Sequence, residues 1–386
     1  MKKKIAIIGS TGSIGTSLLE LVDHKKNDLI LLTANKKYKK LLNQAKKYKV
    51  YNIIISDPSS YKKSIIFNKD KRIKIFNNFN DLNKIIKKKL DYAMLSITGI
   101  EGLLPTFKMI PLTKKIAIAN KESLICAWPI IKKKLKRCKT EFIPVDSEHF
   151  SIWTEIKDKD INIIKKIYLT ASGGPLLNYK LESYNEIGLK KILKHPTWKM
   201  GKKISIDSAT MMNKCYEVIE AKNIFDLKYD QINLLIHPDS YVHAVVVYKN
   251  GISKMILHDT SMKIPIFNTL YANNESFISS KKLDITKLNN LQFQKIMKKK
   301  YPIIKLLDLL PKKHSLFETV IVTINDYLVN LYLQKKLKFT DISKFFFKYI
   351  KMTEFKRYSK LRPRSIYDII NLNKKLILNL STIIKY

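Results

Sequence analysis

The sequence predicts an α/β protein with an N-terminal Rossmann-like, doubly wound sheet, a central α/β domain with a mixed sheet, and a C-terminal helical domain. Four observations predict this class. A buried strand, a glycine-rich turn and a helix open the chain, and strand-like runs alternate with helical patterns as far as residue 145. A hairpin signal, Asn250-Gly251, then appears between two apolar runs, and the patterns from Ile303 onward are helical.

The first element is the apolar run Ile5–Ile8, and Gly9-Ser-Thr-Gly12-Ser-Ile-Gly15 follows it directly. The apolar positions from Ile14 to Val22 then have helical spacing. Glycines between a strand and a helix let the backbone approach a pyrophosphate at the helix N-terminus. The spacing differs from Gly-x-Gly-x-x-Gly, so the position after the first strand carries the prediction of a dinucleotide site.

The second strand, Leu29–Thr33, is followed by Ala34-Asn35-Lys36-Lys37. An NAD enzyme would carry an acidic residue near this point, whereas a cationic turn suits the 2′-phosphate of NADP. The alternative is that codon bias placed the lysines there. Further strands are predicted at the ranges 51–55, 91–98, 115–119 and 142–145, which together delimit a nucleotide-binding domain over residues 1–145.

Two polar clusters follow the later strands, where ligands bind in open α/β sheets. They are Ala119-Asn120-Lys121-Glu122-Ser123 and Pro144-Val145-Asp146-Ser147-Glu148-His149. Asp146 and Glu148, two residues apart in a segment expected to be extended or a loop, could turn both carboxylates toward one hard cation. By themselves they are only a loose acidic pair.

The order of elements changes after Phe150. A strand at 167–171 leads into Ser172-Gly173-Gly174-Pro175, a turn whose N–H groups suit an oxyanion or phosphate, although ordinary turn chemistry explains it equally well. Strands are also expected at 232–236, 242–248 and 252–258. We predict a central domain over residues 146–285, a polar, Lys-rich linker over 286–304 and a helical domain over 305–386.

The segment from His195 to Ala221 concentrates polar side chains. Its second half is predicted to be a helix that begins after Asp207-Ser208. This would place Ser208 at a helix N-terminus, which favours an anion, and Lys214 and Glu217 on one helix face. A phosphate-binding helix that also provides a carboxylate is one interpretation. A capped surface helix with an ordinary ion pair is the other.

The formal net charge is +41, from 73 Lys plus Arg and 32 Asp plus Glu. Lysine is spread along the chain, a pattern typical of A/T-rich codon bias, and no nucleic-acid-binding motif is present, so we expect no nucleic-acid partner. The three cysteines form no Cys-x-x-Cys pair. Because no apolar run is long enough for a membrane span or a signal-peptide core, we expect no membrane partner and a cytoplasmic location.

Six motifs in order resemble the 1-deoxy-D-xylulose 5-phosphate reductoisomerase family of the non-mevalonate isoprenoid pathway. They are Gly9 to Gly15, Asn120-Lys-Glu-Ser, Pro144-Val-Asp-Ser-Glu-His149, Ser172-Gly-Gly-Pro, His195-Pro-x-Trp-x-Met-Gly and Ile206-Asp-Ser-Ala-Thr-Met-Met-Asn-Lys214. The resemblance covers roughly residues 4 to 270 strongly and thins in the C-terminal domain. The ordered set is far more specific than any single motif.

The resemblance implies a homodimeric enzyme that uses NADPH and Mg²⁺ or Mn²⁺, possibly Co²⁺, to convert the sugar phosphate 1-deoxy-D-xylulose 5-phosphate to 2-C-methyl-D-erythritol 4-phosphate. It implies metal ligands at Asp146, Glu148 and Glu217, and catalytic roles for Lys121, Glu148, His195 and Trp198. Implied substrate contacts are Ser147, Ser172, His195, Ser208, Asn213, Lys214 and Glu217. Implied cofactor contacts are Thr11, Gly12, Ser13, Ile14, Asn35, Lys36, Lys37, Asn120, Glu122 and Gly201. We also predict that the segment from His195 to Gly201 is a lid, because it adjoins the predicted phosphate contacts and the resemblance places Trp198 over the substrate. The alternative is that Trp198 is a fixed packing residue.

Three positions depart from the family pattern. Cys215 replaces a glycine, His258-Asp-Thr-Ser261 replaces a Gly-x-Pro-Asp-like turn, and Ile324-Asn325-Asp326 replaces Ala-Asn-Glu. Another NADP-dependent oxidoreductase, such as a semialdehyde or homoserine dehydrogenase, is the alternative enzyme. It would not need the three carboxylates to converge on a metal. A basic nucleic-acid-binding protein is the non-enzyme alternative.

Overall fold

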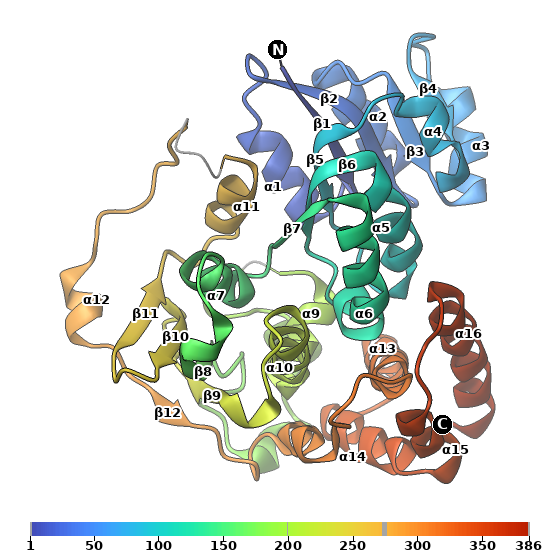
Figure 1. Ribbon diagram of the computed structural model, residues 1–386. Helices are drawn as coiled ribbons and strands as arrows, with labels where there is room; N and C mark the ends of the chain where they lie inside the picture. Colours follow the sequence, from blue (N-terminus) through green and yellow to red (C-terminus); the bar gives the residue numbers. More distant parts are fainter. Residues whose placement is uncertain (1, 199, 272–275, 385–386) are drawn as a thin grey trace. The chain divides into compact units, whose positions relative to one another are not determined.

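The computed structural model describes every residue except 1, 199, 272–275 and 385–386, and it divides into two compact units (Figure 1). The first unit comprises Met1–Ser123, Ile131–Phe150 and Met262–Ser279. The second comprises Leu124–Ile130, Ser151–Ser261 and Ser280–Tyr386. Each unit is built around a sheet of its own.

The first unit contains a seven-stranded sheet in the order β4-β3-β2-β1-β5-β6-β7, with every pairing parallel. The strand order reverses between β1 and β5, so the predicted doubly wound sheet is confirmed. The strands are β1 (Lys3–Ile8), β2 (Asn27–Ala34), β3 (Asn52–Ile55), β4 (Lys74–Phe76), β5 (Leu90–Leu95), β6 (Thr113–Ile118) and β7 (Glu141–Pro144). Sequence reasoning missed β4, which has only three residues and no fully buried side chain.

Helices connect these strands, as parallel pairing requires. They are α1 (Ser13–Leu21), α2 (Tyr38–Lys47), α3 (Pro58–Phe67), α4 (Leu82–Ile85), α5 (Leu103–Met109) and α6 (Lys121–Cys138). A later helix, α11 (Lys263–Leu270), belongs to the same unit and adds Ile266 and Phe267 to the core that contains Leu18 and Leu19. The Tyr271 hydroxyl accepts hydrogen bonds from the Asp23 backbone N–H at 2.8 Å and from Asn27 Nδ2 at 2.9 Å.

The second unit contains a five-stranded mixed sheet in the order β11-β10-β8-β9-β12. Its strands are β8 (Ile164–Ala171), β9 (Ile232–Ile236), β10 (Val242–Tyr248), β11 (Ser253–Leu257) and β12 (Gln294–Lys295). Only β8 and β9 pair in parallel, and β10 and β11 form the antiparallel hairpin that Asn250-Gly251 predicts. Apolar side chains from α7 (Ser147–Ile156) and α10 (Met212–Ile224) pack with β8 and β10 in its core.

The remaining helices are α8 (Leu189–Ile192), α9 (Lys202–Thr210), α12 (Ile285–Asn289), α13 (Phe317–Leu333), α14 (Phe339–Ile350), α15 (Thr353–Lys356) and α16 (Ile366–Ile383). Short 3-10 helices lie at Phe79–Asp81, Ile100–Gly102, Ile110–Leu112, Ile161–Ile163, Leu181–Ser183, Tyr229–Gln231, Pro302–Leu309 and Arg357–Lys360. The helical character predicted for the C-terminal region is confirmed. The predicted linker 286–304 contains most of α12 and all of β12, and the three-domain division stays a prediction. Across the described residues, no helix is long and apolar enough to cross a membrane.

Candidate active site

The glycine turn between β1 and α1 needs glycine for steric reasons. Gly9 has a φ of +95°, and a Cβ there would lie 3.0 Å from the Ser96 carbonyl group. A Cβ on Gly15 would lie 2.5 Å from the Gly9 carbonyl oxygen, so only glycine lets α1 begin this close to β1. Gly12 is the N-cap of α1, and because glycine has no side chain, no side-chain group caps the first N–H groups of the helix. The exposed N–H groups of this helix start therefore suit an anion.

The end of β2 leads into a cationic turn. Asn35, Lys36 and Lys37 are all exposed there. Sequence reasoning missed Lys40, in the first turn of α2, whose Nζ donates hydrogen bonds to the Thr11 carbonyl oxygen and to Thr16 Oγ1, both at 3.0 Å. The available signal was a fourth lysine one helical turn beyond the predicted pair. Lys40 joins the cationic turn to the glycine turn.

Asn120 and Glu122 lie at the start of α6 and are buried. Asn120 is the N-cap, because its Oδ1 accepts a hydrogen bond from the Ser123 N–H at 2.8 Å. Its Nδ2 lies 2.6 Å from the Ile97 carbonyl oxygen, 2.9 Å from that of Gly99 and 3.1 Å from Glu122 Oε2. These contacts hold the loop after β5 against the beginning of α6.

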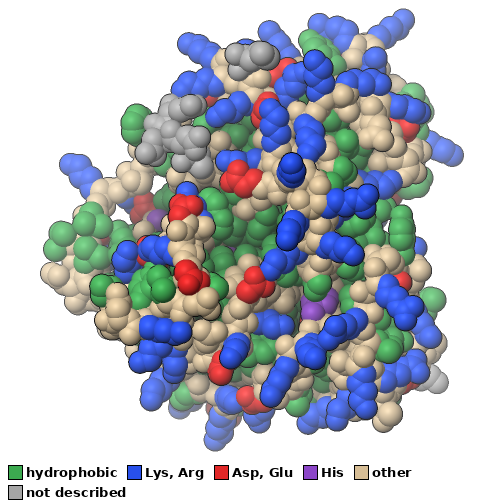
Figure 2. Space-filling model, in the orientation of Figure 1, with side chains coloured by type: hydrophobic (Ala, Val, Ile, Leu, Met, Phe, Trp, Pro, Cys, Tyr) green, Lys and Arg blue, Asp and Glu red, His purple; other side chains and the backbone are tan. Residues whose placement is uncertain are grey.

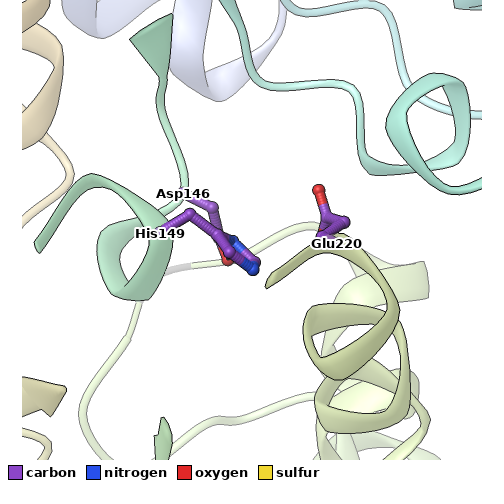
Figure 3. A group of neighbouring side chains, drawn as sticks. All are labelled: Asp146, His149 and Glu220. Carbon is purple, nitrogen blue, oxygen red and sulfur yellow. The ribbon is translucent and has the colours of Figure 1, made fainter. Parts of the chain in front are cut away.

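Asp146 precedes α7 and is held by two basic side chains. Figure 3 shows Asp146 and His149 with their side chains together, and the distance from His149 Nδ1 to Asp146 Oδ2 is 3.1 Å. Lys121 Nζ contacts the same oxygen at 2.8 Å. Burial raises the pKa of Asp146, but the Lys121 charge and the His149 hydrogen bond outweigh burial and hold that pKa well below its usual value. Asp146 is therefore ionised at neutral pH.

The local structure around Glu148 differs from the prediction. The sequence predicts an extended or loop segment for Asp146 and Glu148. That prediction is wrong for Glu148, which lies in the first turn of α7. Ser147 Oγ donates a hydrogen bond to Glu148 Oε2 at 2.5 Å. Glu148 therefore lies at the helix end where the backbone dipoles favour a negative charge.

In the second unit, the loop after β8 packs closely against α9. Gly173 and Gly174 have φ values of +82° and +70°. A Cβ on Gly174 would lie 2.9 Å from the Ser208 carbonyl oxygen, so this glycine permits the approach of the loop to α9. The loop carries Ser172 and α9 carries Ser208. The structure thus brings together two of the predicted phosphate contacts.

Hydrogen bonds determine which His195 nitrogen carries the proton. The backbone N–H groups of Thr197 and Trp198 donate to His195 Nδ1 at 3.2 and 3.0 Å, so Nδ1 accepts and the ring proton is on Nε2. Nε2 in turn donates to Ser172 Oγ at 2.9 Å. Burial and then the Lys214 charge lower the pKa of His195 to about 4, so the ring is neutral at physiological pH.

Two donors fix the direction of the Ser172 O–H group. Its oxygen accepts from His195 Nε2 and also from the Gly174 N–H at 3.0 Å. These two bonds use both lone pairs of the oxygen. The hydroxyl proton is the hydrogen-bonding capacity that remains, and it is suited to an acceptor such as a phosphate oxygen.

The helix that was predicted to begin after Asp207-Ser208 is instead two helices. α9 ends at Thr210 and α10 begins at Met212, with Met211 between them at a φ of 69°. The prediction that Ser208 lies at a helix N-terminus is therefore wrong, since Ser208 is in the last turn of α9. The residue in the first turn of a helix is Asn213, and α10 provides the N–H groups that favour an anion.

Lys214 and Glu217 form a buried pair on α10, so the interpretation as an ordinary surface ion pair is excluded. Lys214 Nζ lies 2.5 Å from Glu217 Oε2 and donates to the Thr170 carbonyl oxygen at 2.6 Å. Asn213 Nδ2 donates to Glu217 Oε1 at 2.5 Å. The pair is 5% and 1% exposed, and charges that deep must be paired. Sequence reasoning missed Glu220, a second buried carboxylate one turn further along α10 (Figure 3), although the i,i+3 spacing was visible.

The segment predicted to be a lid lies between α8 and α9, and residue 199 within it is outside the described residues. Trp198 is half-buried, and its ring packs edge-on against His243, with ring centroids 6.0 Å apart. Gly201 is exposed and is the N-cap of α9. The lid itself stays a prediction.

Comparison with known proteins decides the family. Models described as 1-deoxy-D-xylulose 5-phosphate reductoisomerase, its C-terminal domain and DXP reductoisomerase C-terminal domain match residues 5–128, 142–225 and 257–376. A 1-deoxy-D-xylulose 5-phosphate reductoisomerase from Pelagibacter ubique (strain HTCC1062) is 52% identical over 384 residues, or 98% of this chain and 99% of the relative. This chain belongs to the 1-deoxy-D-xylulose 5-phosphate reductoisomerase family.

Solved reductoisomerase structures share the fold. The enzyme from Zymomonas mobilis in complex with NADPH aligns with a TM-score of 0.88 at 29% identity, covering 99% of both chains. A reductoisomerase in complex with NADPH, fosmidomycin and magnesium aligns with a TM-score of 0.90 at 30% identity, covering 98% of both chains. A reductoisomerase from Sulfurihydrogenibium sp. (strain YO3AOP1) is 37% identical over 381 residues, 98% of this chain and 97% of the relative.

The departures from the reductoisomerase pattern are accommodated in the described structure. Cys215 is buried on α10, where its Sγ lies 3.6 Å from the Ile303 carbonyl oxygen, and burial raises the pKa of its thiol. His258 stacks on His243 with ring centroids 3.7 Å apart. Asn325 and Asp326 both contact side chains of α9. Neither Cys215 nor His258 displaces a predicted metal ligand.

Proposed function

We propose that this protein is an NADPH- and divalent-metal-dependent reductoisomerase that converts 1-deoxy-D-xylulose 5-phosphate to 2-C-methyl-D-erythritol 4-phosphate for isoprenoid precursor biosynthesis. The family membership over the full chain supports this activity. The observation that carries it is the arrangement on β8, α9 and α10. On α10 the Asn213 amide and the Lys214 ammonium contact one buried carboxylate, Glu217, and the loop after β8 contributes the Ser172 hydroxyl, which His195 holds.

The NADPH site is proposed on residues 1–145 together with Gly201. The glycine turn provides Thr11, Gly12, Ser13 and Ile14, and the turn after β2 provides Asn35, Lys36 and Lys37. Asn120, Glu122 and Gly201 complete the proposed contacts. If Lys36 and Lys37 bind the 2′-phosphate, replacing both with Ala will weaken NADPH binding more than NADH binding, because only NADPH carries that group. Equal losses would place the 2′-phosphate elsewhere.

The metal ligands are proposed to be Asp146, Glu148 and Glu217. Carboxylate oxygens are the donors that Mg²⁺ and Mn²⁺ prefer, and Co²⁺ also accepts them. Ligands must be deprotonated, and the low pKa of Asp146 meets this condition. Glu217 is paired with the Lys214 ammonium, whose Nζ lies 2.5 Å from Glu217 Oε2. The donor set therefore fits a hard divalent cation.

The substrate phosphate is proposed to be bound by Ser172, Ser208, Asn213 and Lys214, with Ser147, Lys121 and His195 beside the carbon skeleton. Lys214 and the Ser172 proton are donors that suit phosphate oxygens. His195 holds Ser172 in place through Nε2 and is neutral, so its proposed role is to bind and orient. Proton exchange by His195 is not needed for this role.

Residues of the chain then position the substrate for two chemical steps. When bound, the metal and NADPH supply Lewis-acid stabilisation of substrate oxygens during a skeletal rearrangement and the hydride that reduces the resulting aldehyde. Phosphate binding restrains the far end of the substrate, so binding energy is used to orient the reacting carbons. Trp198 is proposed to close over the substrate and exclude water.

One assay tests the function. Purified protein is mixed with 1-deoxy-D-xylulose 5-phosphate, NADPH and Mg²⁺, and nicotinamide absorbance is followed. Oxidation of NADPH should require both the substrate and the metal, and it should stop when a chelator is added. Turnover that persists with chelator would remove the metal assignment. A folded protein without turnover would remove the proposed reaction.

We also infer a homodimer located in the cytoplasm. β11 is an edge strand of the second sheet, and Met255 on it and Ile252 next to it are 51% and 54% exposed, so this edge offers apolar surface and unpaired backbone to a second copy. Cys138 and Cys215 are free thiols, as expected in a reducing compartment. Light scattering of the wild type and of Met255→Lys tests the dimer.

A further inference from the structure

A polar network links α13, the first long helix of the C-terminal region, to α9, the helix that carries Ser208. Asn325 on α13 is fully buried, and its Nδ2 donates a hydrogen bond to Asp207 Oδ1 at 2.8 Å. Lys203 Nζ contacts Asp207 Oδ2 at 3.1 Å and Asp326 Oδ1 at 3.0 Å. Each oxygen of the Asp207 carboxylate therefore has a donor of its own, and the orientation of this side chain is fixed.

Asp207 connects this network to the end of α9, next to Ser208. Asp207 is 2% exposed and immediately precedes Ser208, in the last turn of α9 before the break at Met211. A helix end next to a break lacks the continuous hydrogen bonding that would restrain it. The bond from Asn325 supplies a restraint at this point. Lys203 also lies over the Tyr216 ring on α10, 5.6 Å from its centroid, so both helices at the break are held.

We propose that Asn325 is a positioning residue for the substrate phosphate, which it never contacts. Its amide fixes Asp207 and thereby the end of α9, which in turn fixes the Ser208 hydroxyl relative to Ser172. This inference rests on the proposed phosphate-binding role of Ser208. It assigns a role in the chemistry of the second unit to a helix in which the sequence showed no functional residue.

The test compares Asn325→Leu with Thr323→Val. Thr323 is equally buried on the same helix, and its Oγ1 lies 2.8 Å from Asn373 Oδ1, on α16 rather than α9. Both changes remove a buried interhelical hydrogen bond at similar size. Asn325→Leu should weaken inorganic phosphate binding, measured by calorimetry, about tenfold and raise the KM for the sugar phosphate to match, with kcat within about twofold. Thr323→Val should change none of these values.

Two further variants separate positioning from simple loss of stability. Asp207→Asn keeps the size of the side chain but makes it a weaker hydrogen-bond acceptor. It should therefore raise the phosphate Kd, as Asn325→Leu does. Adding Asn325→Asp to Asp207→Asn restores an amide–carboxylate pair and should recover most of the phosphate affinity. In a Ser208→Ala background, Asn325→Leu should have little additional effect, because both changes then act on one contact.

Three outcomes would overturn the inference. Asn325→Leu could match Thr323→Val in phosphate Kd and KM, the exchanged pair could fail to recover affinity although folded, or the effects of Ser208→Ala and Asn325→Leu could be additive. Turnover by the wild-type enzyme reports separately on the proposed function. An inactive wild type that still binds phosphate, with the expected loss in Asn325→Leu, would retain the positioning role and reject the reaction.

Discussion

At the scale of single residues, the most consequential prediction is that Glu217 is a metal ligand. Glu217→Gln should lower kcat/KM at least about a hundredfold and raise the Mg²⁺ concentration needed for half-maximal activity, because a neutral amide is a poor ligand for a hard cation. The amide keeps its size beside Asn213 and Lys214, so the circular dichroism spectrum should be unchanged. Glu186→Gln, at an exposed position, is the matched control. Near-normal turnover in Glu217→Gln would contradict the metal assignment.

His195 leads to a prediction about pH. Its pKa is lowered from 6.5 to about 4 in the folded protein, so the unfolded chain binds more protons between these values. Stability should therefore be complete above pH 6.5 and fall as the pH is lowered toward 4, with His195 contributing roughly 1 to 2 kcal/mol. Urea unfolding at pH 5 and pH 7 measures the difference, and His195→Asn should reduce it. The pH profile of kcat should show no His195 titration between pH 5 and 8.

Residue types and spacing were sufficient to nominate Lys214 with Glu217, because an i,i+3 pair shares a helix face in any helix. They were insufficient to determine that the pair is buried or that Asn213 contacts the same carboxylate. Burial depends on what packs over α10. The tautomer of His195 could not be predicted from the sequence either, since it depends on a contact with Ser172, which lies 23 positions earlier in the chain.

At the scale of elements, the contact between the loop after β8 and α9 predicts a glycine requirement. Gly174→Ala should sharply weaken phosphate binding, because Cβ would meet the Ser208 carbonyl oxygen and the φ of +70° strains any L residue. The left-handed backbone alone costs about 1 to 2 kcal/mol. Gly188→Ala is the control, because its Cβ would meet nothing within 4 Å. Equal phosphate Kd values in the two variants would refute the requirement.

The proposed lid around Trp198 gives a second prediction at this scale. Trp198 is only half-buried, so Trp198→Ala should lower kcat/KM strongly with little loss of stability. Trp128, which is 6% exposed, is the control: its replacement by Ala should cost about 3 to 5 kcal/mol of folding free energy. Protease should cleave residues 195–203 faster in the apo enzyme than with NADPH and a phosphonate substrate analogue. Equal cleavage, together with a large stability loss in Trp198→Ala, would make Trp198 a packing residue.

The break at Met211 shows why helix ends were predicted less well than helix existence. Helix-forming residues continue from Lys202 through Ile224, so nothing in the local pattern signals two helices. Met211 adopts a φ of 69° without being glycine, which sequence rules treat as improbable. The hydrogen bond from Asn325 on α13 reaches α9 at Asp207, four residues before this break.

At the scale of the whole molecule, the parallel sheet was predictable because strand, turn and helix signals are local. The composition of the two compact units was not. α11 lies between β11 and β12 of the second unit in sequence, yet its side chains lie in the core of the first. Its apolar pattern is compatible with either core. Only complementary packing against α1 selects between them, and packing of this kind is not encoded within one segment.

The net charge of +41 supplies the last prediction. Figure 2 shows Lys and Arg side chains spread over the visible face, and so large a net charge creates a long-range positive field. That field should attract NADPH and the sugar phosphate and repel Mg²⁺. Raising the ionic strength from about 0.02 to 0.3 M should therefore increase the KM of both anions and lower the half-saturating Mg²⁺ concentration.

The opposite signs make this prediction specific, because a general effect of salt on folding would move all three constants in the same direction. Tetramethylammonium chloride provides ionic strength without a cation that competes for carboxylates. Steady-state kinetics at four salt concentrations, with the thermal midpoint measured alongside, check it. Binding to double-stranded DNA should vanish by physiological salt, since it would depend only on counterion release. Salt-independent KM values would contradict the predicted attraction of the anionic substrates. Sequence-selective DNA binding at 0.15 M salt would contradict the expectation that there is no nucleic-acid partner.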